Sequence, residues 1–184
     1  MDGPYAAVCG ISEEEMLTQM DNDVDILAMR MEVSREEVLA KLKDNYDGYH
    51  FTWPSPDVFN PFSLLNAFED GKLNSYWFGS GTPTYLIEML RKFHVLPSEV
   101  GHSMQAMAAS FDAPTERMTT ITPLLYQSGY VTIKDYDKYT ELYTLDIPNR
   151  EIRVGLMQSL LPNYLAYNTC LLYTSPSPRD ISGS

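Results

Sequence analysis

The sequence predicts an α+β fold that is mostly helical, with a helical, lid-like region followed by a winged-helix-like unit that contains one β-hairpin. Two observations predict it. Helix-start signals at Ser12, Ser34 and Asn60 precede apolar residues spaced three or four positions apart, which is typical of amphipathic helices. Later in the chain a helical, a hairpin and a second helical pattern follow one another, which is the order of a winged-helix wing region.

Four regions are expected. Residues 1–93 form the helical lid-like region, and residues 94–118, which are polar and interrupted by proline and glycine, form a linker. Residues 119–169 form the winged-helix-like unit, and residues 170–184 form a disordered tail. A chain of 184 residues can bury one core, in one domain or two small ones.

The first region begins with Tyr5–Gly10, a short apolar stretch that suits a buried strand or an extended segment. Ser12–Glu15 is a capping box that starts a helix, which Asp21–Asp25 interrupts as a solvated acidic turn. A second capping box, Ser34–Glu37, starts another helix. We expect that helix to end at Gly48 with a left-handed glycine cap, so that the two helices form a hairpin.

The stretch 45–68 organises the prediction because it is unusually aromatic. Its aromatic residues are Tyr46, Tyr49, Phe51, Trp53, Phe59, Phe62 and Phe68. That number suits a packed joint between a preceding and a following layer better than a surface linker. Asn60 is the expected N-cap of a new helix, with Pro61 at its first position.

Beyond the joint the pattern becomes mixed. Tyr76–Phe78 is a short apolar element, and Thr82–Pro83 is an N-cap and first-turn proline that start a helix reaching Phe93. Met104–Ala109 suggests a short helix, and Ile121–Gly129 a longer one with an early proline.

The predicted hairpin pairs Tyr130–Lys134 with Leu142–Asp146. An amphipathic helix follows, with apolar residues at Ile152, Leu156, Leu160 and Tyr164.

Charge and cysteine content exclude several classes of protein. The net charge is −12, and residues 1–70 carry 15 acidic but only 4 basic side chains, so that part is a poor surface for nucleic acid. Two cysteines make no disulfide framework. We find no signal peptide and no apolar run of about 18 residues, so we expect a cytoplasmic protein with no membrane segment.

We assign no catalytic, cofactor-binding or metal-binding residue to this chain. Asp21, Asp23 and Asp25 alternate as in a Ca²⁺ loop, but Ile26 replaces the glycine that such a loop needs. His50, His94 and His102 lack a metal-ligand spacing, and we interpret His50 as a partly buried packing residue.

Other polar residues have structural interpretations as well. Gly79–Thr82 could bind an anion at a helix start, although glycine-rich helix starts usually serve as turns and caps. Cys9 has no nearby base and reads as a small core residue. Asp47 reads as a turn residue, and no carboxylate pair is placed to face one cleft.

The hairpin region is a weak candidate for nucleic-acid contact. In a winged helix, its cations could touch phosphates, with Gln127 and Ser128 near the end of a recognition helix. The cations are Lys134, Lys138, Arg150 and Arg153. Four acidic residues, Asp135, Asp137, Glu141 and Asp146, alternate with them and largely cancel the positive field.

The tail has a separate origin in our interpretation. Cys170–Asp180 reads like the translation of a transposase-type sequencing adaptor, and Ile181–Ser184 like an index sequence. Segments of this kind are excluded from fold reasoning. The alternative is an ordinary disordered tail rich in serine and proline.

Seven short segments, in a fixed order, point to one family. They are Tyr5–Glu15, Tyr46–Tyr49, Phe59–Ser63, Tyr76–Phe78, Gly81–Leu86, Leu124–Tyr130 and Pro148–Arg153. At these segments the chain resembles the predicted AAA-ATPase-like family of bacterial proteins, which typically carry a PD-(D/E)XK nuclease domain toward the C-terminus. Each segment alone is weak, but together they span nearly all of residues 1–167.

The resemblance implies that the chain is an internal fragment. The family's P-loop and acidic Mg²⁺ residue would lie upstream, and its nuclease downstream, so ATP and Mg²⁺ would belong to the full-length parent. The sequence agrees, because no Gly-x-x-x-x-Gly-Lys-[Ser/Thr] motif occurs: Gly71-Lys72 is preceded by Asn66 where the first glycine would stand. The expected partners are the missing ATPase core and nuclease domain of the same protein.

Three functions remain open at this point. The leading hypothesis is a non-catalytic lid or coupling segment of such a protein, which transmits nucleotide state toward the C-terminal domain. The second is a stand-alone winged-helix module that binds nucleic acid. The third is an enzyme with an unrecognised site.

Overall fold

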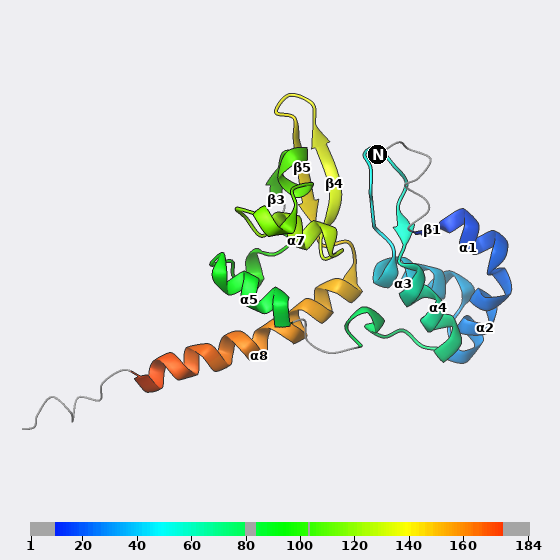
Figure 1. Cartoon of the computed structure of the whole chain (residues 1–184). Helices are drawn as coiled ribbons and strands as arrows, with labels where there is room; N and C mark the ends of the chain where they lie inside the picture. The colour runs from blue at the N-terminus through cyan, green and yellow to red at the C-terminus, as the bar shows by residue number, and fades with distance from the viewer. Residues whose placement is uncertain (1–9, 80–83, 103, 175–184) are drawn as a thin grey trace, which may run out of the picture.

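The computed structural model describes residues 10–79, 84–102 and 104–174, with the side chains of the last helix described through Asn163. The fold is α+β and mostly helical, as predicted, and its hairpin follows the helical region. Two hydrophobic cores lie side by side: helices α1 to α4 enclose the first, and the three-stranded sheet with α5, α7 and α8 encloses the second (Figure 1).

The first body is a set of short helices held at a two-stranded ribbon. Its elements are β1 (Ile11–Ser12), α1 (Glu13–Gln19), α2 (Asp21–Met31), α3 (Arg35–Tyr46), β2 (Val58–Phe59) and α4 (Pro61–Asp70). Strands β1 and β2 are antiparallel, with Ile11 opposite Phe59. The largest buried side chains in this core include Met16, Leu27, Leu42, Tyr46, Phe59 and Leu64.

The predicted helix starts are confirmed in this body. Ser12 accepts a hydrogen bond from the Glu15 amide, and the Glu15 carboxylate accepts one in return, which completes the capping box. Ser34 caps α3, and Asn60 caps α4 with Pro61 in its first turn. These caps satisfy amide groups that the first turn of a helix leaves without partners.

Two local predictions in this body were wrong. Asp21–Asp25 do not form a turn: they begin α2, where Arg35 binds the carboxylates of Asp21 and Asp25. Acidic side chains suit the first turn of a helix because they face the positive end of its dipole. Helix α3 ends at Tyr46 with an extended cap at Asp47, two residues before the predicted end, although Gly48, next to the cap, has the predicted positive φ of +95°.

The second body combines an antiparallel sheet with helices. Its elements are η2 (Tyr76–Phe78), α5 (Thr84–Lys92), η3 (Pro97–Glu99), β3 (Met104–Ala106), α6 (Ala108–Phe111), η4 (Thr115–Arg117), α7 (Thr122–Gln127), β4 (Thr132–Asp137), β5 (Leu142–Asp146) and α8 (Arg150–Thr174). The strand order is β3-β5-β4, with Ile133 opposite Leu145 in the hairpin. The predicted hairpin is therefore confirmed.

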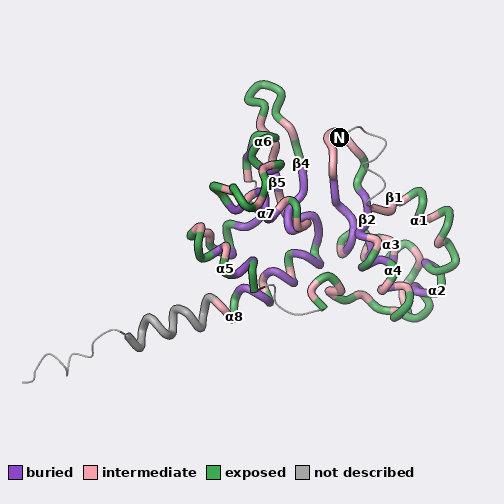
Figure 2. The backbone as a smooth tube through the Cα atoms, in the orientation of Figure 1, coloured by how far each residue is buried: buried purple, intermediate pink, exposed green. Residues whose placement is uncertain are grey.

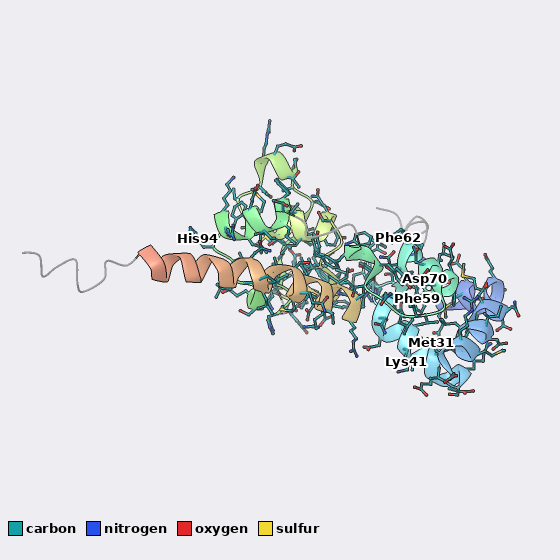
Figure 3. The ribbon with its side chains drawn as sticks, turned by 90° about the horizontal axis from the view of Figure 1, so that it is seen from below. Met31, Lys41, Phe59, Phe62, Asp70 and His94 are labelled. Carbon is teal, nitrogen blue, oxygen red and sulfur yellow. The ribbon has the colours of Figure 1, made fainter. Side chains whose placement is uncertain are left out.

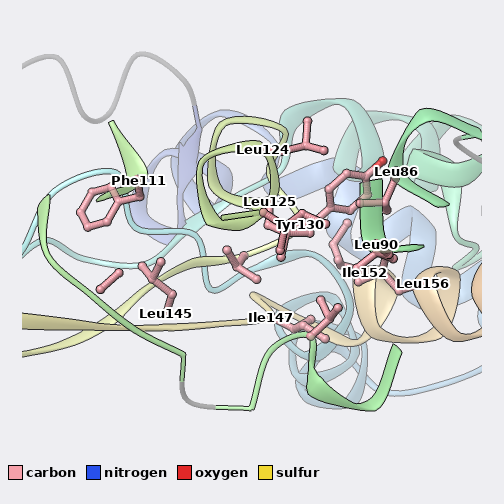
Figure 4. Packing of buried hydrophobic residues seen from close by; sticks show 14 of the residues in the cluster. Leu86, Leu90, Phe111, Leu124, Leu125, Tyr130, Leu145, Ile147, Ile152 and Leu156 are labelled. Carbon is pink, nitrogen blue, oxygen red and sulfur yellow. The ribbon is translucent and has the colours of Figure 1, made fainter. Parts of the chain in front are cut away.

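Residues 94–118 contribute to this body, whereas the sequence suggested a linker. Met104–Ala106 is a strand rather than the start of a helix, and it pairs with β5. Phe111 is buried in the second core, where its ring contacts the rings of Tyr126 and Tyr143. Helix α5 also packs into this core, through Leu86 and Leu90 (Figure 4), whereas the sequence pattern places it with the first region.

Helix α8 forms the base of the second body. Its buried side chains Ile152, Leu156 and Leu160 have the predicted helical spacing, and Leu86 and Leu90 of α5 lie close to Ile152 and Leu156 (Figure 4). The helix continues to Thr174, so the first five residues of the predicted tail, 170–174, are helical, and residues 175–184 lie outside the described part. None of the helices described here has the length and apolar character of a membrane span.

Buried and exposed residues are distributed unevenly along the chain. Figure 2 shows buried backbone along the start of α8 and through the joint near β2, whereas the loop between β4 and β5 is exposed. In the view from below, Met31, Lys41, Phe59 and Asp70 lie at one end of the molecule and His94 lies toward the other (Figure 3). Buried residues near β2 and at the start of α8 therefore mark the region where the two bodies adjoin.

Candidate functional site

The joint segment, residues 47–60, passes between the two cores. Tyr46 and Phe59 belong to the first core, whereas Tyr49 and Val58 belong to the second. Tyr49 and Val58 exchange two backbone hydrogen bonds, of 3.2 and 3.1 Å, which closes the segment into a loop. The predicted aromatic joint is confirmed. The neighbouring residues Val58 and Phe59 pack into different cores, Val58 into the second and Phe59 into the first.

Asp47 and Gly48 form the tightest part of this joint. Asn149 donates from Nδ2 to the Asp47 carbonyl oxygen at 2.9 Å, and its Oδ1 accepts from the Ile152 amide at 3.2 Å. Gly48 has φ +95°, and a Cβ there would lie 2.3 Å from the carbonyl oxygen of Pro148. Only glycine fits such a close approach at a positive φ, so this corner of the joint is fitted to the segment that begins α8.

Lys134 fastens the hairpin to the same corner. Its Nζ donates to the carbonyl oxygens of Gly48 and Pro148, at 2.7 and 3.3 Å. Burial lowers the pKa of Lys134, while the nearby carboxylates of Asp57, Asp146 and Asp47 oppose that shift. The ammonium group that the sequence offered as a phosphate contact is therefore already engaged in the fold.

His50 and Thr132 add a second fastening point. The Thr132 hydroxyl accepts from the His50 amide at 2.8 Å and donates to the His50 carbonyl oxygen at 2.7 Å. The His50 ring is buried beside Trp53 and contacts Ser55 and Asp57 through its two nitrogens. The predicted burial of His50 among aromatic residues is confirmed.

Glu151 is the most deeply buried carboxylate of this junction, with only 2% of its surface exposed. Its Oε1 accepts from the Ser63 hydroxyl at 2.8 Å and from the Trp77 amide at 2.9 Å, which links α8 to α4 and η2. Oε2 has no hydrogen-bond partner among the described residues. Burial raises the pKa of this carboxyl group.

Four of the segments that carry the family resemblance meet at this junction. They are Tyr46–Tyr49, Phe59–Ser63, Tyr76–Phe78 and Pro148–Arg153. Glu151 lies within the last of them, yet the sequence analysis gave it no role, because a glutamate in the first turn of a helix usually only faces the helix dipole. Its neighbours Arg150 and Arg153 are charged, and only Ile152 beside it hinted at burial.

Two pockets adjoin the junction. The first, of about 870 Å³, lies beside Glu151 and is lined by residues that include Asn45, Phe62, Asn74, Trp77, Arg150 and Gln158. The second, of about 680 Å³, lies between the joint segment and the second body, with an aromatic lining that includes Tyr49, Phe51, Trp53, Phe111, Tyr126 and Tyr143.

The remaining sequence candidates are dispersed. Of the Gly79–Thr82 segment only Gly79 lies in the described part, where it ends η2, and Cys9 also lies outside it. No cluster of three or more histidine, cysteine or acidic side chains suitable for a metal occurs among the described residues. Asp47 is mostly buried, with its pKa raised by burial, and its Oδ1 has no partner within the described part.

The candidate nucleic-acid residues are also dispersed. Gln127 donates to the carbonyl oxygens of Phe111 and Ala113, at 3.1 and 2.8 Å. Lys138 lies in the exposed turn of the hairpin, while Arg150 and Arg153 are exposed on the first turns of α8. The structure thus does not bring the predicted cations and the end of α7 into one basic surface.

Comparison with known proteins finds one informative similarity. The chain is 32% identical over 174 residues to a protein of Azotobacter chroococcum mcd 1 described as an uncharacterized protein in the vnfD 5′ region. The match covers 90% of this chain but only 30% of that relative. No family model matches the chain, and no solved structure matches it.

Proposed function

We propose that this chain is a non-catalytic coupling segment of a longer, AAA-ATPase-like protein, in which the first body acts as a lid and passes a nucleotide-dependent movement to the second body. The observation that carries the proposal is the junction, where Asn149 and Lys134 donate hydrogen bonds to backbone carbonyl oxygens and Glu151 accepts one from Ser63, so that both bodies are joined. Buried, directional contacts of this kind favour a small number of discrete arrangements.

Two further observations support a segment rather than an enzyme. The sequence contains no phosphate-binding Gly-x-x-x-x-Gly-Lys-[Ser/Thr] loop, which P-loop hydrolysis requires for the triphosphate. The chain spans about 30% of the length of the curated relative that it matches. We place an ATPase core and a PD-(D/E)XK nuclease in the parent, and ATP with Mg²⁺ would bind to that core.

The first test uses the purified chain. Isothermal titration with ATP and Mg²⁺ is expected to give no heat of binding, and a phosphate-release assay is expected to show no turnover above buffer. Tight, Mg²⁺-dependent capture of ATP by the chain alone would overturn the proposal. Turnover that copurifies with the chain through successive columns would overturn it as well.

The second test uses the full-length gene product that contains this segment, with ATP turnover and DNA cleavage measured separately. Asn149→Ala removes the bond to the Asp47 carbonyl oxygen, whereas Asn163→Ala removes only a bond to Ser159 within α8. We expect the first variant to retain turnover but to lose the effect of ATP on cleavage. The second should behave as wild type. Normal coupling in a folded Asn149→Ala protein would contradict the proposed role.

The alternative is a winged-helix nucleic-acid-binding module, and one observation favours it. The order α5, β3, α6, α7, β4, β5, with the sheet order β3-β5-β4, supports this alternative because helices and an antiparallel hairpin alternate in it as a winged helix would require. The engagement of Lys134 and Gln127 within the fold argues against it. A salt-dependent mobility shift of labelled DNA would support this alternative, and no shift at low salt would remove it.

A further inference from the structure

The pocket between the joint segment and the second body is too large to be a packing defect. Its volume is about 680 Å³, whereas protein interiors leave few voids larger than a water molecule. Phe51 and Trp53 of the joint segment line it and stay partly exposed, and so do Tyr126 and Tyr143 of the second body. A volume of roughly 300–1,000 Å³ with a mainly aromatic lining is typical of a small-molecule site.

The rings of this pocket form two separate walls. In the joint segment, Tyr49 and Phe51 are stacked, with their planes 9° apart. In the second body, Phe111 contacts Tyr126 and Tyr143, at centroid distances of 4.7 and 5.4 Å. Among the described residues, no ring contact joins one wall to the other. The pocket therefore leaves room for a flat group between two aromatic surfaces, which is a favourable position for stacking.

Internal hydrogen bonds hold the joint wall in place. The His50 backbone binds the Thr132 hydroxyl through its amide and its carbonyl oxygen, and the Tyr49 hydroxyl donates to the Gly129 carbonyl oxygen at 3.3 Å. Because Tyr49 and His50 directly precede Phe51, these bonds fix the backbone that carries its ring. A wall that is already ordered loses little entropy when a ligand binds.

The polar groups of the lining narrow the chemistry of that ligand. Gln127 donates from Nε2 to the carbonyl oxygens of Phe111 and Ala113, which fixes the orientation of its amide and leaves Oε1 without a hydrogen bond in the described part of the chain. The exposed carboxylate of Asp112 adds further acceptor oxygens. No lysine or arginine is found among the described residues of the lining, and both nitrogens of the His50 ring already have partners. This set of groups favours N–H donors and disfavours phosphate.

We propose that this pocket binds a planar nitrogen heterocycle that carries N–H donors and no phosphate. The ring stacks between Phe51 and the wall of Tyr126 and Tyr143, and its N–H groups donate to Gln127 Oε1 and the Asp112 carboxylate. Nucleosides and free bases belong to this class. The site goes beyond the coupling role, because it needs neither ATP hydrolysis nor the parent protein. ATP is not its ligand, because a triphosphate would face Asp112 with no lysine or arginine to neutralise it.

The experiment is an NMR titration of the ¹⁵N-labelled chain, followed at the indole N–H signals. The chain has two tryptophans: Trp53 lines this pocket and is the reporter, whereas Trp77 does not line it and should shift less. The probes are adenosine, guanosine and cytidine, at constant ionic strength. Ribose, which lacks the planar ring, is the negative control, and the 5′-monophosphate of the tightest nucleoside tests the exclusion of phosphate.

We expect a saturable shift of Trp53 with at least one nucleoside and none with ribose. The monophosphate should bind at least about threefold more weakly, and Asp112→Asn should reduce that ratio by about twofold or more. Phe51→Leu should weaken the nucleoside by at least about threefold, because it removes a stacking face. Tyr139→Leu is the matched control: this ring is 99% exposed in the hairpin turn, so its loss should leave the affinity unchanged.

Three outcomes overturn the proposal. They are no saturable shift with any of the three nucleosides, equal affinity in a folded Phe51→Leu variant, and a monophosphate that binds as tightly as its nucleoside. If Phe51→Leu does not fold, Asp112→Asn decides in its place, because its side chain is exposed. An unchanged ratio between nucleoside and monophosphate in that variant would also overturn the proposal.

Discussion

At the scale of single residues, Glu151 and Lys134 show how the junction handles charge. Each places an ionisable group in a largely buried position, and the hydrogen-bond partners of each are neutral. Glu151 accepts from a hydroxyl and an amide, and Lys134 donates to two carbonyl oxygens. Burial raises the pKa of Glu151 and lowers the pKa of Lys134, so in both residues burial disfavours the charged form. The free energy of unfolding should therefore depend on pH through these two residues.

The sign of that dependence can be predicted for Glu151→Gln. The native pKa of Glu151 lies above its ordinary value of 4.5, so between these two values the unfolded chain has lost the proton that the folded chain retains. The free energy of unfolding of the wild type then falls as the pH rises through this interval. The Glu151→Gln variant has no proton to lose at this position, so its free energy of unfolding does not fall in this way. The difference between variant and wild type should therefore grow in favour of the variant as the pH rises through the interval, and become constant above it.

Urea unfolding at a series of pH values, with both proteins in the same buffers, measures this difference. Gln158→Ala serves as the control, because it removes a neutral side chain from the same pocket. Its difference from wild type should not vary with pH. A Glu151→Gln difference that is equally flat would show that the burial of Glu151 carries no cost.

At the scale of elements, the sequence predicted local structure well wherever the signal was local. The caps at Ser12, Ser34 and Asn60 each depend on a side chain and an amide two or three residues away, and all three were confirmed. Strand β3 was missed because Met104–Ala106 is held by pairing with β5, about forty residues later. A tripeptide with one polar residue at its centre carries no sign of such a distant partner.

The junction could not be predicted for the same reason. Asn149 and Asp47, or Glu151 and Ser63, are separated by 102 and 88 residues. Neither pair has a spacing that a periodic pattern could reveal. What the sequence did indicate was the aromatic joint, because aromatic residues clustered at 45–68 and so predicted packing without naming the partners.

The attachment of the hairpin to the joint gives a prediction at this scale. Lys134→Met keeps the length of the side chain but leaves the carbonyl oxygens of Gly48 and Pro148 without this donor. We expect the free energy of unfolding to fall by about 1–3 kcal/mol, toward the lower end because a half-buried charge is removed at the same time. Urea unfolding followed by circular dichroism measures the change.

Lys138→Met is the matched control, because Lys138 lies in the exposed turn of the same hairpin. It should change stability by no more than about 0.5 kcal/mol. If both variants are equally stable, Lys134 does not fasten the hairpin. If Lys134→Met also abolishes DNA binding without loss of stability, the phosphate-contact interpretation is the better one.

At the scale of the whole molecule, the two cores are distinct but share one joint. Close packing at η2 also ties them: a Cβ on Gly155 of α8 would lie 2.0 Å from the ring of Phe78, which packs against the second core, and Tyr76, two residues earlier, packs against the first. Helix α8 therefore contacts η2 by packing and by the Glu151 bonds, while the joint segment enters both cores. Neither body can move far without breaking buried contacts.

This arrangement predicts that the two bodies unfold together. Native-state hydrogen exchange can follow both, with the amides of Leu27 and Leu42 reporting on the first core and those of Ile133 and Leu145 on the second. Increasing urea should bring the opening free energies of the four amides to one common value, because global unfolding becomes the only route to exchange. Asn149→Ala removes the cap of α8 and the bond to Asp47, and should separate the two pairs by about 1–2 kcal/mol. Asn163→Ala, whose bond stays within α8, should keep them together. Two separate values in the wild-type chain would mean that the bodies are independent, and a lid movement in the first could not then reach the second.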